Sequence, residues 1–240
     1  MKHIPCSGED VARFMLLPGD PGRAKRIAER MDEAEFILQN REFTLYKGKT
    51  GGVEVGVCST GIGGPSASIA LEELASAGAE VFIRVGSAGG RQPDIPIGTP
   101  IILTAAFRGD GTSAAYLPRE FPAVADFSVT KALVEAAERV KVPYRLGVGY
   151  TRDAYYRRDP RLDELLRDAG VVAAEQEAAT LFVVGMCRGV KVGAIVATDS
   201  NIWLSPQPPA EARKRAFAEG EGHVIDIALL AARILAGREG

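Results

Sequence analysis

Two glycine-rich turns, each following an apolar run, carry arginine side chains suited to binding a small anion. Residues 17–23 spell LPGDPGR, and residues 82–90 spell FIRVGSAGG. Glycine lets a backbone approach a ligand closely, free N–H groups at a helix start attract anions, and arginine adds a charge-assisted hydrogen bond. These residue types predict a phosphate site. For residues 17–23 taken alone, an ordinary turn capped by Asp20, with Arg23 in solvent, is the simpler interpretation.

Arg84 is the hardest of these residues to explain without a ligand. It lies inside an otherwise apolar strand, and a buried arginine is rare unless it is paired or ligated. Strand spacing puts Arg84 and Gly86 on one face, with the Ser87 hydroxyl at the strand end. The three residues predict a phosphate pocket. A purely structural arginine–carboxylate pair is the alternative.

A third glycine-rich turn, STGIGGPS over residues 59–66, matches neither of the common nucleotide-binding loops. It lacks the lysine of a Walker loop, and it does not fit the dinucleotide-binding pattern G-x-G-x-x-G with its acidic partner. Sites for nucleoside triphosphates and dinucleotides are therefore disfavoured. A tight turn that packs a helix on the sheet is the plain interpretation.

The composition narrows the classes of partner. The 240 residues are 46% hydrophobic and 25% charged, with a net charge of -2, which argues against binding nucleic acid or an acidic membrane. Most of the 29 basic residues are arginine. The planar guanidinium of arginine matches phosphate and carboxylate groups better than the ammonium group of lysine does. The three cysteines form no C-x-x-C pair, so neither a structural zinc site nor a disulfide framework is expected. With no secretory apolar region and no membrane-spanning run, a cytoplasmic location is expected.

The elements that must position these turns alternate between strand-like and helix-like patterns. Alternation of this kind predicts an α/β fold, here a single domain over residues 1–240 with a mixed, mostly parallel twisted sheet flanked by helices. Ligands of such folds bind beyond the carboxyl ends of the strands. The predicted strands cover residues 14–17, 53–59, 81–85, 101–107, 144–150 and 192–198. The predicted helices cover residues 23–31, 66–77, 130–140, 177–188 and 210–236.

Several longer motifs, in this combination and order, resemble the hexameric type of the nucleoside phosphorylase family. That family includes uridine phosphorylases and bacterial purine nucleoside phosphorylases. The likeness runs from the N-terminus to about Thr198, and residues 109–138 look most like uridine phosphorylase. The motifs are PGDPGRAKRIAE, NREFTLYKGK, STGIGGPSASIALEELASAGAEVFIRVGSAGG and AEQEAATLF.

The resemblance implies a role for each residue that matches a family motif. The implied phosphate-binding residues are Gly19, Arg23, Arg84 and Ser87, with Arg41 lent by a neighbouring subunit. The implied ribose-binding residues are Glu175, Gln176 and Glu177, with His3 reaching across the same interface. The residues implied for the base are Tyr155, Arg157, Arg158 and Asp199. A monovalent cation (K⁺) between subunits is implied at Glu42, Ile62 and Ser66.

Departures from the family pattern leave the base open. Gln176 replaces an apolar residue that packs against sugar and base, and Ser87 stands where uridine phosphorylases usually carry Thr. Uridine phosphorylases contact the pyrimidine through a Gln and an Arg, but residues 155–161 (YYRRDPR) contain no Gln. Asp199 lies in TDSN, which resembles the segment whose Asp protonates purines. Uridine is the favoured substrate, and a purine nucleoside is the alternative.

The resemblance implies phosphorolysis of a nucleoside, with phosphate as co-substrate and no other cofactor. The arginines would hold phosphate beneath a ribosyl cation-like transition state. The catalytic set is Arg84, Glu177, which holds the ribose hydroxyls, and Asp199, which protonates a purine. For a pyrimidine, Arg157 or Arg158 would stabilise the leaving base. A nucleosidase of the same fold, in which water attacks, would not require three phosphate arginines. A non-catalytic nucleoside-binding protein would tolerate their loss.

Each implied role has a structural competitor. Arg41 is also explained as a solvated loop residue, and a lone terminal histidine such as His3 is usually incidental. Glu175 and Glu177 precede an apolar helix and would interact favourably with its dipole. If Arg41 and His3 do act across an interface, a homodimer is the minimum functional unit. The resemblance alone implies a hexamer.

Overall fold

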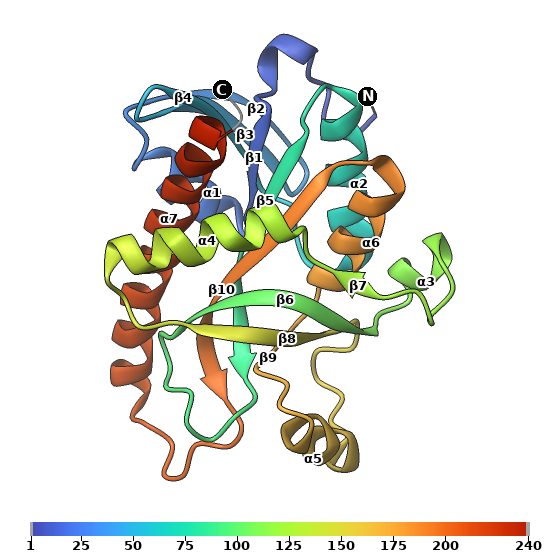
Figure 1. The fold of residues 1–240 in the computed structure, drawn as a ribbon, viewed down its shortest axis with the longest axis vertical. Helices are drawn as coiled ribbons and strands as arrows, with labels where there is room; N and C mark the ends of the chain where they lie inside the picture. Colours follow the sequence, from blue (N-terminus) through green and yellow to red (C-terminus); the bar gives the residue numbers. More distant parts are fainter. Residues whose placement is uncertain (1, 239–240) are drawn as a thin grey trace.

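A computed structural model of the chain describes residues 2–238. Its strands form one twisted mixed sheet in the order β10-β6-β8-β9-β5-β1-β4-β3-β2, with β7 paired to β6 (Figure 1). The strands are β1 (Phe14–Leu17), β2 (Glu33–Asn40), β3 (Phe43–Thr50), β4 (Val53–Cys58), β5 (Val81–Gly90), β6 (Pro100–Gly109), β7 (Ala123–Val124), β8 (Arg145–Arg152), β9 (Ala173–Glu175) and β10 (Lys191–Asn201).

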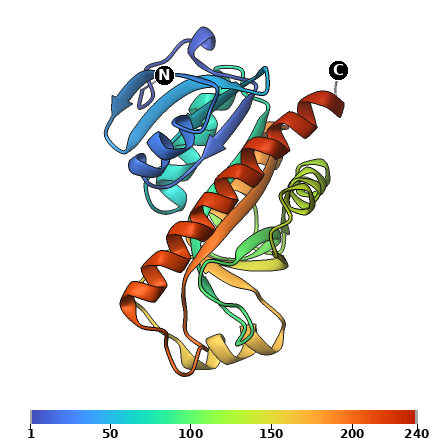
Figure 2. The same cartoon turned by 90° about the vertical axis from the view of Figure 1, so that its left-hand side faces the viewer.

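Helices cover both faces of this sheet. Helices α2 and α6 pack on one face, and α1, α4 and α7 pack on the other, where α7 runs along the length of the molecule (Figures 1 and 2). A separate buried apolar cluster lies under each set. The helices are α1 (Pro21–Ala28), α2 (Gly64–Ser76), α3 (Thr112–Tyr116), α4 (Phe127–Val140), α5 (Pro160–Asp168), α6 (Ala178–Arg188) and α7 (Ala210–Arg238), preceded by the 3₁₀ turn η1 (Gly8–Asp10).

The sheet combines parallel and antiparallel pairs of strands, including the antiparallel pair β5–β9 at its centre. Strands β4, β1, β5 and β10 pair in parallel, as do β6, β8 and β9 in order. The hairpin β2–β3 is antiparallel, and β10 also pairs antiparallel with β6. Because β9 pairs with β5, strands β5, β10, β6, β8 and β9 close into a ring. The predicted α/β class with a mixed sheet and flanking helices is confirmed.

The carboxyl ends of the central strands bring the glycine-rich turns together. The turn after β1 and the turn after β4 are hydrogen-bonded directly: the Thr60 amide donates to the Pro18 carbonyl at 2.8 Å, and the Gly61 amide donates to the Gly19 carbonyl at 2.9 Å. Strand β5 lies between β1 and β10, so its end adjoins these turns. The predicted position of the site, beyond the strand ends, follows from this topology.

Most of the secondary structure missed by the sequence analysis lies at the margins of the fold, but β9 lies inside the sheet between β8 and β5. The hairpin β2–β3, the short strands β7 and β9, and the helices α3 and α5 were not predicted. Strand β5 also continues through the glycines to Gly90, where the sequence suggested a turn from Gly86. No helix in the described part of the chain combines the length and apolar character that crossing a membrane needs.

Candidate functional site

A cleft of about 1260 Å³ lies at the carboxyl ends of the central strands. Its walls come from the turns after β1 and β4, from β5, β9 and β10, and from the segment between β8 and α5. Residues assigned to phosphate, ribose and base in the sequence analysis therefore share one cavity. The predicted residues that line it are Gly19, Arg23, Glu42, Ile62, Arg84, Ser87, Tyr155, Arg158, Glu175, Gln176, Glu177 and Asp199.

Arg84 lies in the middle of the sheet and is 3% exposed. Its Nε is 2.9 Å from Oε2 of Glu175, and its Nη2 forms an ion pair with Glu177. Its Nη1 is buried without a hydrogen-bond partner among residues 2–238. The arginine–carboxylate pair offered as an alternative is therefore real, and the same side chain also lines the cleft. The two interpretations of Arg84 are compatible.

Gly86 gives the Arg84 side chain the room that it needs. The two residues share one face of β5, as their spacing predicts, and a Cβ at Gly86 would lie 2.8 Å from Nη2 of Arg84. Such a contact is shorter than van der Waals packing permits. A glycine at this position therefore lets the guanidinium lie back along the strand, toward the glutamates.

Glu175 is buried and fully engaged. Its carboxylate accepts hydrogen bonds from the Thr151 hydroxyl at 2.5 Å and from the amides of Glu177 and Ala178 at 2.9 Å each. Burial, reinforced by the neighbouring Glu177, raises the pKa of Glu175 even though Arg84 acts in the opposite direction. The position of its carboxylate is thus fixed from the start of α6, and it holds Nε of Arg84.

Glu177 connects the turn after β4 with Arg84. Its Oε1 accepts a hydrogen bond from the Gly63 amide at 2.6 Å, while Oε2 faces the Arg84 guanidinium. The turn of residues 59–66 thus holds an acidic side chain at the wall of the cleft, beyond its plain role of starting α2. Its carboxylate is placed to accept hydrogen bonds from a polyol beside an anion.

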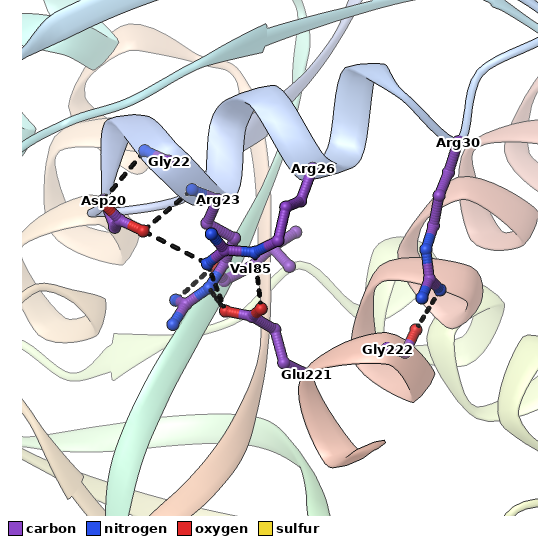
Figure 3. Close-up of polar contacts among 8 residues, drawn as sticks. All are labelled: Asp20, Gly22, Arg23, Arg26, Arg30, Val85, Glu221 and Gly222. Atoms are coloured by element: carbon purple, nitrogen blue, oxygen red, sulfur yellow. Dashed lines mark hydrogen bonds and ion pairs between the residues drawn. The ribbon is translucent and has the colours of Figure 1, made fainter. Parts of the chain in front are cut away.

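Arg23 is held from two directions in the first turn of α1 (Figure 3). Asp20 caps the helix by accepting hydrogen bonds from the amides of Gly22 and Arg23, as the simpler interpretation expected. The Arg23 side chain is not in solvent, however, since it is 5% exposed. Its Nε donates to Glu221 at 2.6 Å and its Nη1 to the Val85 carbonyl at 3.3 Å.

Glu221, on α7, is a residue of this site that the sequence analysis missed. Besides Arg23, it accepts hydrogen bonds from Nε and Nη2 of Arg26 at 2.8 and 2.9 Å (Figure 3). Burial opposes its charge, but the hydrogen bonds from both arginines hold the pKa of Glu221 below its ordinary value. It stands 198 residues from Arg23 in an amphipathic helix, so no local pattern distinguishes it from a solvated acid.

The wall assigned to the base is aromatic and basic. Tyr155 and Tyr156 meet edge to face at 5.0 Å and are both exposed. Asp199 lies at a register shift between β5 and β10, a bulge of the kind that turns a side chain toward a site, and it accepts a hydrogen bond from the Ser200 hydroxyl at 2.7 Å. The structure separates Arg157 from Arg158: only Arg158 lines the cleft, whereas Arg157 lines a smaller adjacent cavity of about 180 Å³.

The residues expected to act across an interface do not line the cleft of their own chain. Arg41 is exposed at the tip of the β2–β3 hairpin with φ 55°, a conformation uncommon outside glycine. His3 is held by Glu73 of α2, which accepts hydrogen bonds from the His3 amide and lies 2.9 Å from its Nδ1. In the same turn as Arg41, Glu42 faces the cleft and accepts a hydrogen bond from the Ser66 hydroxyl at 2.6 Å.

Comparison with known proteins gives one consistent result. Residues 13–230 match the Phosphorylase superfamily. A uridine phosphorylase of Thermococcus kodakarensis is 46% identical over 83% of this chain and 76% of the relative, and a guanosine phosphorylase of Halorubrum lacusprofundi is 38% identical over 87% of each. The crystal structure of uridine phosphorylase from Vibrio fischeri superposes with a TM-score of 0.92, at 34% identity over 97% of both chains. The family resemblance expected from the motifs is confirmed, and the chain belongs to the phosphorylase superfamily.

Proposed function

We propose that this protein catalyses the phosphorolysis of uridine, yielding uracil and ribose 1-phosphate. The observation that carries the proposal is that Arg23 and Arg84 line one cleft together with Glu177. Each of the two arginines is held by a buried carboxylate. Arg84 keeps Nη1, and Arg23 keeps Nη2, without a hydrogen bond to any described residue. Donors that are fixed in place and unoccupied are what a phosphate dianion requires.

The geometry supports a mechanism in which phosphate is both nucleophile and counter-charge. Arg23, Arg84 and the Ser87 hydroxyl hold the dianion below C1′ of the sugar. The C1′–N bond breaks with its electron pair moving to the base, while a phosphate oxygen forms the new bond to C1′. Phosphate stabilises the positive charge that develops on the ribosyl group. Glu177 orients the ribose hydroxyls, and Arg158 stabilises the charge on the departing pyrimidine.

Within this mechanism, Glu175 acts by holding Arg84 in place. All the hydrogen bonds to its carboxylate come from the chain itself, and its side chain is 0% exposed. Glu177 is therefore the acidic group that contacts ribose. Gln176 lines the cleft with its amide nitrogen donating to the Asp153 carbonyl at 2.9 Å, which leaves its amide oxygen available to the sugar.

A purine nucleoside is the second candidate substrate. Two observations favour it: the bulge that turns Asp199 toward the cleft, and the similarity to a guanosine phosphorylase. A carboxylic acid at this position would donate a proton to the ring nitrogen of a departing purine. Tyr155 offers an aromatic face to either class of base.

Assembly, cation binding and cellular location form the outer part of the proposal. Arg41, exposed at the hairpin tip, suits delivery to the phosphate of a neighbouring subunit in a dimer or hexamer. His3 would reach that neighbour's ribose in the same way. Glu42 and Ser66, with Ile62 beside the same turn, present oxygen atoms for a K⁺ ion. The three free cysteines suit a reducing cytoplasm.

Incubation with single nucleosides, with and without phosphate, tests this proposal. Uridine, thymidine, inosine and adenosine are supplied in turn, and free base and ribose 1-phosphate are measured. Uridine cleavage that requires phosphate is expected. Release of base without phosphate would assign the protein as a nucleosidase, and rapid inosine cleavage with none for uridine would assign it to purines.

A further inference from the structure

Arg91 lines the cleft and has hydrogen-bonding capacity that the protein itself does not use. It immediately follows β5 and is 3% exposed. One nitrogen, Nη1, donates to Oδ1 of Asp163 at 2.8 Å. Its Nε is buried without a hydrogen-bond partner, and Nη2 donates to no residue in the range 2–238. A buried guanidinium left partly unpaired in this way is unfavourable unless a ligand completes it.

Its position assigns Arg91 to the base end of the cleft. It follows Arg84 by seven residues, which corresponds to about 23 Å at about 3.3 Å per residue. Arg158 shares Asp163 with Arg91, through Oδ2 at 3.3 Å, and the exposed Tyr155 lines the same cleft. The arginines assigned to phosphate lie elsewhere: Arg84 is in the first half of β5, and Arg23 is in the first turn of α1.

The described groups around Arg91 leave its remaining N–H groups without a hydrogen-bond acceptor. Burial lowers the pKa of Arg91; Asp163 opposes this shift, and the positive charges of Arg152 and Arg158 add to it. Arg152 donates to the carbonyls of Tyr155 and Arg157, and Asp163 already serves two arginines. A ligand oxygen carrying partial negative charge would satisfy the free N–H groups, whereas a ligand amino group would place donor against donor.

We propose that Arg91, held in place by Asp163, is a base-selecting residue that donates a hydrogen bond to a carbonyl oxygen of the nucleobase. This proposal rests on the proposed function. It adds a base contact from the residue after β5 to the base contacts proposed for the segment between β8 and α5. The same contact stabilises the departing base, because negative charge moves onto its carbonyl oxygens as the glycosidic bond breaks. Bases with a carbonyl at this point are favoured over bases with an amino group.

Steady-state kinetics of Arg91→Lys and Arg91→Met test the assignment. Arg91→Lys keeps a positive charge beside Asp163, so it is expected to fold normally, but it loses the planar guanidinium and its additional N–H groups. Both variants should lower kcat/KM for uridine by about 10- to 100-fold, the range for a hydrogen bond to a charged group. The KM for phosphate should stay at its wild-type value. Arg139→Met, which removes an exposed arginine on α4, is the matched control and should change neither.

The results that would overturn the assignment are distinct. Wild-type uridine kinetics in both variants would show that Arg91 is only a partner for Asp163. A parallel rise in the KM for phosphate would place it with the anion site. A loss of activity in Arg91→Met alone, accompanied by a lower melting temperature, would show a structural role. If the wild-type protein cleaves inosine and not uridine, the proposed function fails, and the same kinetic measurements on both variants with inosine, whose base also carries a carbonyl oxygen, still test Arg91.

Discussion

At the scale of single residues, the site is a set of arginines whose positions are fixed by buried acids. Glu175 and Glu177 hold Arg84, Glu221 holds Arg23, and Asp163 holds Arg91. The attraction within a buried pair is largely offset by the cost of removing both charges from water, so the pairs fix geometry more than they add stability. Removing one member, however, leaves an uncompensated buried charge. Each arginine keeps at least one N–H group for a ligand.

Glu221→Gln tests this principle at the phosphate end. The amide keeps the shape of the side chain but removes the charge that binds Arg23 and Arg26, so Arg23 should lose its fixed position. We expect the KM for phosphate to rise about tenfold, with a smaller change in the KM for uridine. Asp226→Asn, which alters an exposed pair between α7 and Arg30, is the control. Equal effects of the two substitutions would contradict the role given to Glu221.

Sequence reasoning identified site residues where a local pattern marked them. Arg84 was detectable because a charge interrupts an apolar strand, and Arg23 because it follows a glycine-rich turn. Glu221 was missed because its partner lies 198 residues away and nothing local marks it. Arg91 was missed because it follows glycines that the sequence suggested were a turn, so no apolar run marks it as buried.

At the scale of elements, the long strands β5 and β10 build the site, and irregularities in them aim its side chains. The bulge at Asp199 and the glycines of β5 have this effect. The predicted strands and helices of the centre are confirmed because burial on both faces leaves strong apolar runs. The hairpin β2–β3 was missed because β2 is largely exposed and its alternation is weak. Helix α5 could have been predicted, because Asp159 followed by Pro160 is a typical helix start.

Gly86→Ala tests the contribution of β5. The new Cβ would lie 2.8 Å from Nη2 of Arg84 and 3.0 Å from Cγ1 of Val196, so the guanidinium must move away from Glu177. A displacement of about 1 Å at a reacting group lowers turnover by roughly 100-fold, and we expect a loss of this order in kcat/KM for phosphate. Gly237→Ala, at an open position of α7, should leave the kinetics unchanged. Wild-type phosphate kinetics in Gly86→Ala would show that Arg84 does not contact the anion.

At the scale of the whole molecule, one chain supplies a cleft without the two residues that were predicted to come from a neighbouring subunit. Arg41 lies at the hairpin tip and His3 lies beside α2, both outside the lining of their own cleft. The sequence predicted their function only through family resemblance, because a residue that acts on a neighbour has no pattern within its own chain. The α/β class was predicted from the alternation of elements.

Subunit complementation tests whether sites are shared. Arg41→Ala and Arg84→Ala chains should each be inactive alone. In a mixed dimer, one site combines the intact Arg84 of one chain with the intact Arg41 of the other, so roughly a quarter of wild-type activity should return at equal mixing. The measurement is phosphate-dependent uracil release after co-refolding, with the mixed species confirmed by native mass spectrometry. Mixed dimers without activity would contradict a shared site.

The central claim is that phosphate held by Arg23 and Arg84 becomes bonded to C1′ of the nucleoside. Phosphorus-31 NMR of the protein with uridine and phosphate measures this transfer directly. We predict that inorganic phosphate is consumed and ribose 1-phosphate appears in an amount equal to the uracil released. Uracil release with free ribose and undiminished phosphate, or no uracil release at all, would contradict it.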